Sequence, residues 1–167
     1  ALGIYRVAKS IGKEACIILN SYNNTLEDIV QDAKASEQYE FLTSEKALAL
    51  ADGNSLGVVV ETHRPILVES LELLEKINRT VVIDHHRRTE GDLPNVLLSY
   101  MESYASSASE LVSEIVQYAC EKKSLTKLEA DALLAGIMVD TNRFAVKAGV
   151  RTFEAASWLR RAGADLE

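Results

Sequence analysis

The sequence has 167 residues, which suits one domain, and 47% of them are apolar, which is enough for a real core. Its 18 basic and 25 acidic side chains leave a formal charge of −7, which argues against a broad nucleic-acid surface and against duplex nucleic acid as a partner. No apolar run is long enough to span a membrane and no signal peptide is visible, so we expect no membrane contact by this domain.

Helices and strands are predicted from apolar periodicity and from capping residues. The segments Ser107–Glu110 and Thr126–Glu129 are capping boxes that open long helices, whereas uniformly apolar segments predict buried strands. In chain order we expect a helix at 4–11, a strand at 15–19, a helix opened by Thr25 and Asp28, a helix from Thr43 to Leu50, a strand at 56–60, a helix at 71–77, strands at 80–83 and 95–99, helices at 107–122 and 126–139, and a last helix that Thr152 caps and Gly163 ends.

This alternation of strands and helices predicts an α/β fold. We expect a doubly wound, Rossmann-like, mostly parallel sheet with helices on both faces, and the strand at 95–99 toward an edge. A first strand normally precedes a helix such as 4–11, so we expect that the first strand is missing from this chain, which starts at Ala1. Ligands of such sheets bind beyond the carboxyl ends of the strands.

The two cysteines indicate the compartment. Cys16 and Cys120 are far apart in the sequence and do not resemble a disulfide framework. We predict that both are buried thiols in a reducing compartment, and therefore that this is a cytoplasmic domain.

The segment Val81–His86 is the strongest functional signal. Its apolar strand ends in an acid and two imidazoles, a costly set to place at the edge of a core without a reason. Carboxylate oxygens and neutral imidazole nitrogens are ligands of divalent cations such as Mn²⁺. With acids at another strand end and at a helix end, the predicted metal ligands are Glu61, His85 and Asp140.

Each of these residues also has a structural explanation when taken alone. Asp84 could be a turn residue, a single histidine could be hydrogen-bonded, and Asp140 could be an exposed acid at a fraying helix end, where the dipole disfavours an anion. The adjacent pair His85-His86 is harder to explain, because neighbours in an extended segment point opposite ways. One of the two could bind metal while the other meets substrate.

Several cations near these segments could face a phosphate. Turns or solvated surface explain them nearly as well, and Pro65 supports a turn at 63–65. The stretch 143–152 could be a substrate-facing loop, and Ser106 and Ser107 are best explained as helix caps, although a helix N-terminus also binds anions. The candidates for substrate binding are Arg64, Arg87, Arg143 and Arg151.

Five segments, in this order, resemble the DHH phosphoesterases, and most of all the cyclic-di-AMP phosphodiesterases of the GdpP/YybT type. The likeness covers nearly the whole chain. Its segments are V-V-V-E-T-H-R-P (58–65), V-I-D-H-H-R-R (82–88), Y-A-S-S-A-S-E-L-V (104–112), G-I-M-V-D-T (136–141) and V-R-T-F-E-A-A (150–156).

The resemblance implies a site with two manganese ions that hydrolyses phosphoester bonds. In the family, the position of Glu61 is an Asp that bridges both metals, and those of His85 and Asp140 are ligands of the second metal. The resemblance further implies that His86 lies near the phosphate and that Asp84 orients a histidine. His86 and Asp84 are therefore the predicted catalytic residues.

Two departures from the family pattern affect these expectations. Glu61 adds one methylene, roughly 1.5 Å, where the family has Asp. From the resemblance we expect that the opening motif His-x-x-x-Asp-x-Asp would lie just before Ala1, and that this chain lacks the C-terminal companion domain of the DHHA1 type as well. We therefore expect residues 1–167 to be a DHH-domain fragment that binds at most one Mn²⁺ ion weakly.

The predicted function is hydrolysis of cyclic-di-AMP to the linear dinucleotide, with the isolated fragment impaired or inactive. An alternative is a relative that acts on short oligonucleotides or linear dinucleotides, and another is a non-catalytic binding or structural module. A homodimer is compatible with these features, and the parent protein could be membrane-anchored.

Overall fold

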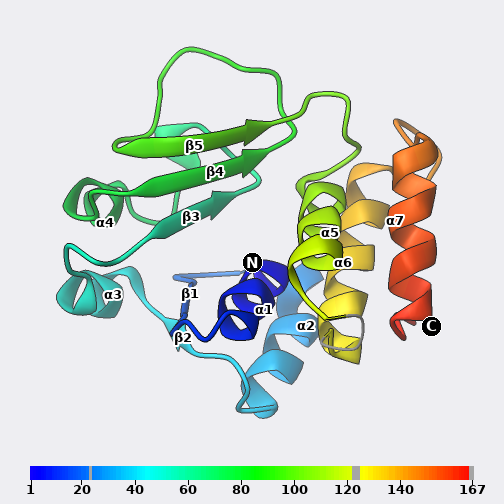
Figure 1. The fold of residues 1–167 in the computed structure, drawn as a ribbon, viewed down its shortest axis with the longest axis horizontal. Helices are drawn as coiled ribbons and strands as arrows, with labels where there is room; N and C mark the ends of the chain where they lie inside the picture. Colours follow the sequence, from blue (N-terminus) through cyan, green and yellow to red (C-terminus); the bar gives the residue numbers. More distant parts are fainter. Residues whose placement is uncertain (23, 122–124, 166–167) are drawn as a thin grey trace.

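The strands in the described part of the chain form two parallel sheets (Figure 1). The computed structural model describes residues 1–22, 24–121 and 125–165. In one sheet β1 (Ile17–Ile18) pairs with β2 (Phe41–Leu42). In the other, β4 (Thr80–Asp84) lies between β3 (Gly57–Val60) and β5 (Val96–Met101). The predicted parallel α/β fold is confirmed, although the strands divide into two sheets instead of one.

Helices separate most of the strands along the chain, as expected for parallel pairing, whereas a loop of residues 85–95 joins β4 directly to β5. The bounds of the helices and strands differ from the predicted ones by a few residues. The side chain of Thr25, which was predicted to cap a helix, and residue 122, the predicted end of another, lie outside the described part of the chain. The helices are α1 (Leu2–Ser10), α2 (Asn24–Ala35), α3 (Ser44–Leu50), α4 (Leu71–Lys76), α5 (Ala108–Ala119), α6 (Lys127–Asp140) and α7 (Val150–Arg161), with a 3₁₀ turn, η1, at Pro65–Leu67.

Capping residues fix several helix starts. Thr43 accepts a hydrogen bond from the N–H of Lys46 at the start of α3, and Thr126 with Glu129 forms the predicted capping box of α6. The prediction for Thr152 was wrong, because α7 already begins at Val150. Thr152 lies in the first turn of α7, where its hydroxyl accepts from the N–H of Gly149.

The central strand β4 of the β3–β4–β5 sheet is covered on both faces, whereas most of the edge strand β5 is exposed. Alternate side chains, including Val58, Val81 and Ile83, face the cluster that contains α5 and α6. Val82, which points the other way, packs with Leu74 of α4 and with the loop before β5. The prediction of helices on both faces is therefore confirmed for this sheet, and β5 is at its edge as expected.

The largest core lies among the helices beside this sheet. Leu111 of α5, Ile137 of α6 and Leu159 of α7 are fully buried there, and α1 packs against α5 and α6. Figure 1 shows α5, α6 and α7 together on one side, at the end toward which the arrows of β3, β4 and β5 point. Loops that leave these strands consequently meet the start of α5 and the end of α6.

Two smaller predictions need correction. The strand β2 was missed, because two residues are too short to show an apolar pattern. Cys16 was predicted to be buried within a strand, yet it precedes β1 and is exposed, and Cys120 is only partly buried after α5.

Among the described residues, no helix combines the length and the apolar character that crossing a bilayer requires.

Candidate metal centre beyond β3 and β4

The carboxyl ends of β3 and β4 bring two functional segments together. Val60 pairs with Ile83 in the parallel ladder, and the N–H of Glu61 donates to the carbonyl of Ile83 over 3.0 Å. The chain leaves β3 at Glu61 with a φ of 77°, a left-handed conformation that side chains other than glycine adopt at a cost. This turn carries the Glu61 side chain over the end of β4.

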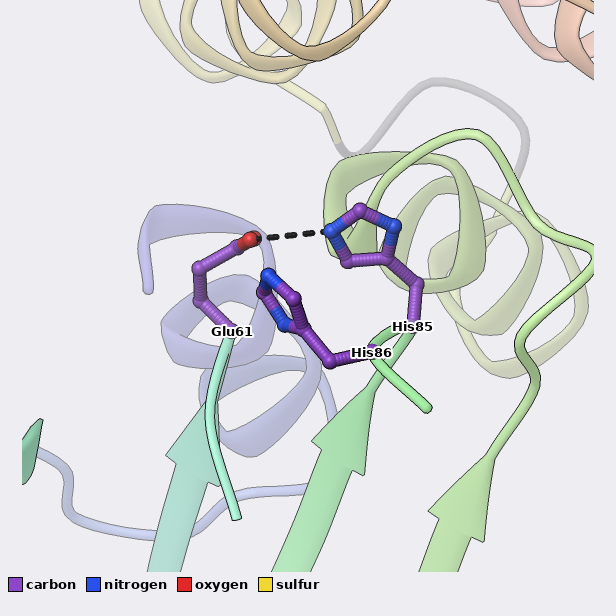
Figure 2. A group of neighbouring side chains, drawn as sticks. All are labelled: Glu61, His85 and His86. Carbon is purple, nitrogen blue, oxygen red and sulfur yellow. Dashed lines mark hydrogen bonds and ion pairs between the residues drawn. The ribbon is translucent and has the colours of Figure 1, made fainter. Parts of the chain in front are cut away.

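Glu61, His85 and Asp140 converge beyond these strand ends. Nε2 of His85 lies 3.1 Å from Oε1 of Glu61 and 3.7 Å from Oδ2 of Asp140, the last residue of α6. Figure 2 shows the Glu61 carboxylate facing the rings of His85 and His86 past the arrowheads of the strands. The structure thus brings all three predicted metal ligands to one place, and their role as ligands remains a prediction.

The two adjacent histidines do not point opposite ways. Their ring centroids are 4.5 Å apart, and one nitrogen of each lies within 4.8 Å of a Glu61 carboxylate oxygen. The expectation of opposite directions was wrong, because β4 ends at Asp84 and the chain bends at His86. The N–H of His86 turns back to donate to Oδ1 of Asp84 over 3.1 Å.

Asp84 is fully buried and contacts two histidines. Its Oδ1 lies 2.7 Å from Nδ1 of His86, and its Oδ2 lies 2.6 Å from Nδ1 of His63. Burial of the carboxylate raises its pKa, but the hydrogen bonds from His63 and His86 outweigh this effect, and the pKa of Asp84 falls below its ordinary value. The acid is therefore an anion that holds the ring of His86 in place.

The charges in the cluster fit a cation. Burial and the negative charge of Glu61 raise the pKa of Asp140. The hydrogen bond to Glu61 and the charges of Glu61 and Asp140 raise the pKa of His85 despite its burial. Two carboxylates that repel each other across an imidazole are a donor set for a divalent ion of the manganese or zinc kind, which would offset the repulsion.

The loop after Asp140 is conformationally unusual. Asn142, Arg143 and Phe144 are consecutive residues with φ between 46° and 65°, and Lys147 has a φ of 53°. Such conformations cost of order 1 kcal/mol or more each and persist where surrounding contacts enforce them. The hydroxyl of the buried Thr141 accepts from the N–H of Phe144, and the charge of Lys147 acts on Asp140.

The predicted substrate-binding arginines divide into two groups. Arg64, Arg87 and Arg143 are exposed, so they remain candidates. Arg151 instead donates from Nε and from one terminal nitrogen to the two carboxylate oxygens of Glu114, over 2.9 and 2.8 Å. This bidentate pair gives Arg151 a structural partner between α7 and α5.

Most of the chain matches a known protein family. The DHH family, N-terminal domain, matches residues 1–137. The chain belongs to the DHH family. Members of this family of phosphoesterases are metal-dependent, which agrees with the cluster of carboxylates and imidazoles at the strand ends.

Curated relatives of this DHH domain include cyclic-di-AMP phosphodiesterases. The chain is 43% identical over 169 residues to the one named GdpP from Bacillus subtilis (strain 168). It is 39% identical over 170 residues to the one named PdeA from Listeria monocytogenes serotype 1/2a (strain 10403S). Each match covers 99% of this chain and 26% of the relative, so the chain spans about a quarter of their length.

A solved structure confirms the DHH fold. An exopolyphosphatase-related protein from Bacteroides fragilis superposes with a TM-score of 0.78, over 98% of this chain and 48% of that one. The two sequences are 20% identical, so the likeness supports the fold alone.

Sequence reasoning missed one residue of this site and one buried contact of the neighbouring helix α5. His63 was assigned to a turn, whereas it is buried against Asp84; its position two residues after Glu61, at the same strand end, was the available signal. Glu110 was expected to complete a capping box with Ser107, but its side chain accepts instead from Ser106 and from Thr152 of α7. Only the other half of the box is present, with Ser107 accepting from the N–H of Glu110.

Proposed function

We propose that this DHH domain hydrolyses cyclic-di-AMP to the linear dinucleotide with the help of bound Mn²⁺. The observation that carries the proposal is the approach of Glu61, His85 and Asp140 within 3.1 and 3.7 Å at one sheet edge. The relatives named as cyclic-di-AMP phosphodiesterases, which match 99% of the chain, support this substrate.

Glu61, His85 and Asp140 are the residues that would hold the metal, with His86 at their side. A bound divalent cation of this kind acidifies a water molecule and offsets the charge of phosphoryl oxygens. Mn²⁺ accepts oxygen and nitrogen ligands in an octahedral set, so further ligands must come from water, from substrate or from beyond the described residues. The isolated 167 residues are accordingly expected to hydrolyse the substrate slowly.

The neighbouring side chains have separate roles in this proposal. Asp84 holds the ring of His86 through Nδ1, so the other ring nitrogen remains available to a phosphoryl oxygen or to its proton. Arg64, Arg87 and Arg143 are exposed and can neutralise the second phosphate of a cyclic dinucleotide.

The free thiols of Cys16 and Cys120 support a reducing, cytoplasmic location.

The proposal is tested by following cyclic-di-AMP hydrolysis in the complete natural protein with Mn²⁺. His85→Ala and Asp140→Ala should each lower kcat by about two orders of magnitude or more, because each removes a ligand. Lys13→Ala, which changes an exposed side chain in the turn after α1, serves as the control and should leave kcat unchanged.

Two results would overturn the proposed function. Equal turnover after exhaustive treatment with a chelator would exclude a role for the metal. Turnover of linear dinucleotides without turnover of cyclic-di-AMP would favour the alternative substrate class.

A further inference from the structure

His63 links the loop after β4 to the candidate metal centre. Its Nδ1 lies 2.6 Å from Oδ2 of Asp84, and its Nε2 lies 3.1 Å from the backbone nitrogen and 3.0 Å from the hydroxyl of Thr89. Both His63 and Asp84 are buried. A buried imidazole with partners on both nitrogens has a fixed position and a restricted choice of protonation state.

The contact with Thr89 settles which nitrogen of His63 carries the proton. A backbone N–H can only donate, so Nε2 must accept. A neutral imidazole then carries its proton on Nδ1, from which it donates to the Asp84 carboxylate. The 2.6 Å distance agrees with a hydrogen bond to a charged acceptor.

The same reasoning applies to His86 on the other side of Asp84. Oδ1 of Asp84 already accepts from the backbone N–H of His86, so it is the acceptor and Nδ1 of His86 is the donor over 2.7 Å. With a proton on Nδ1, the nitrogen of this ring that can carry a lone pair is Nε2. One nitrogen of this ring lies within 4.8 Å of the potential ligand atoms of Glu61 and His85. Because Nδ1 is engaged with Asp84, Nε2 is the nitrogen that can bind a metal ion or a substrate next to them.

We propose that His63 is a positioning residue, which orients Asp84 from behind and thereby fixes the direction and the tautomer of His86. Without the donor at Oδ2, the Asp84 carboxylate would be free to rotate about χ2, and the two hydrogen bonds that hold His86 would lose their fixed acceptor. Thr89 completes the chain by fixing the tautomer of His63. This inference deepens the proposed function, on which its kinetic test rests.

A first test needs no variant and no substrate. Long-range ¹H–¹⁵N NMR correlations of the metal-free protein at neutral pH report the tautomer of each histidine. The expected result is His63 as the neutral Nδ1–H tautomer and His86 with its proton on Nδ1. A His63 ring that is protonated on Nε2 alone, or on both nitrogens, would overturn the inference.

A second test compares two substitutions of His63 by Mn²⁺ titration and by steady-state kinetics. His63→Phe keeps a ring but loses both hydrogen bonds, and should lower Mn²⁺ affinity or kcat by about 10–100-fold with little change in KM. In His63→Asn the amide nitrogen is two bonds from Cβ, like Nδ1, so it can still donate to Asp84. This variant should recover most of the loss.

The control and the contrary outcomes separate this inference from the proposed function. Thr62→Ser, in the same turn, should behave like the unaltered protein, because it keeps the hydroxyl that accepts from the N–H of Arg64 and does not face Asp84. A folded His63→Phe protein with unchanged Mn²⁺ affinity and kcat would overturn the positioning role. If the unaltered protein neither binds Mn²⁺ nor hydrolyses cyclic-di-AMP, the proposed function fails, and the NMR tautomers still decide the role of His63.

Discussion

Oδ2 of Asp140, at the end of α6, lies 3.7 Å from Nε2 of His85, just beyond the end of β4. The end of α6 therefore contributes Asp140 to the site, and the carboxyl ends of β3 and β4 contribute Glu61 and His85. Burial and the negative charge of Glu61 raise the pKa of Asp140, so this acid lies close to another anion at a helix end whose dipole also disfavours negative charge.

Asp140→Asn should weaken Mn²⁺ binding while leaving the fold intact, because the amide has the same shape without the charge. We expect affinity to fall by more than the roughly 10–100-fold that loss of an outer hydrogen-bond partner costs. Titration calorimetry of the variant measures this directly. Asp32→Asn, on the exposed side of α2, removes an equal charge and should bind Mn²⁺ as before. Equal affinities for both variants would exclude Asp140 as a ligand.

The buried carboxylate of Glu129 should matter for stability. It accepts from Nε of Arg6, from the hydroxyl of Tyr39 and from the N–H of Thr126, and so joins α1 and the chain before β2 to the start of α6. Glu129→Gln leaves Arg6 without its charged partner and should lower the free energy of unfolding by about 2–3 kcal/mol.

Urea unfolding measures that loss as a shift of the midpoint at constant m. Glu27→Gln is the matched control, because Glu27 is exposed on α2 and should give a change within about 0.5 kcal/mol. A midpoint for Glu129→Gln as high as that of the control would show that the buried network contributes little.

Close packing of α5 on α6 depends on Gly136. A Cβ built on Gly136 would lie 2.9 Å from Cβ of Ser109 and would also collide with its hydroxyl. Gly136→Ala should therefore destabilise the protein by about 1–2 kcal/mol, although alanine is the better helix former. Thermal unfolding provides the measurement.

Two further variants test this explanation. Gly53→Ala, which has nothing within 4 Å of the added Cβ, should cost little. Combining Gly136→Ala with Ser109→Gly should give a loss smaller than the sum of the two single losses. Strict additivity would mean that the two helices do not meet through these residues.

Local signals explain what the sequence predicted correctly. The strand that ends at Asp84 and the caps at Thr43 and Thr126 depend on residues within a few positions of one another. The placement of Glu61 and His85 at one edge follows from parallel pairing of two apolar strands. These features could therefore be read from the chain without knowledge of its tertiary contacts.

The errors concern contacts between distant segments. The direction of His86 depends on a bend after β4, and the burial of His63 depends on its contact with Asp84 of another strand. Neither contact leaves a periodic trace in the sequence. The division into two sheets leaves no such trace either, because the sequence of a strand does not state which other strand it pairs with.

Glu61→Asp introduces the residue that the family resemblance implies at this position, and it should change stability and metal binding in opposite directions. Asp tolerates the left-handed φ of 77° better than Glu does, so the free energy of unfolding without metal should rise by up to about 1 kcal/mol. In the unaltered protein the Glu61 carboxylate lies 3.1 Å from Nε2 of His85. The Asp side chain is shorter by roughly 1.5 Å, so its carboxylate would lie farther from His85 and Mn²⁺ affinity should fall. Urea unfolding and Mn²⁺ titration of the same preparation give both quantities. A gain in affinity and in turnover would mean that the extra methylene of Glu61 misplaces the carboxylate, and no change in either would mean that residue 61 is not a ligand.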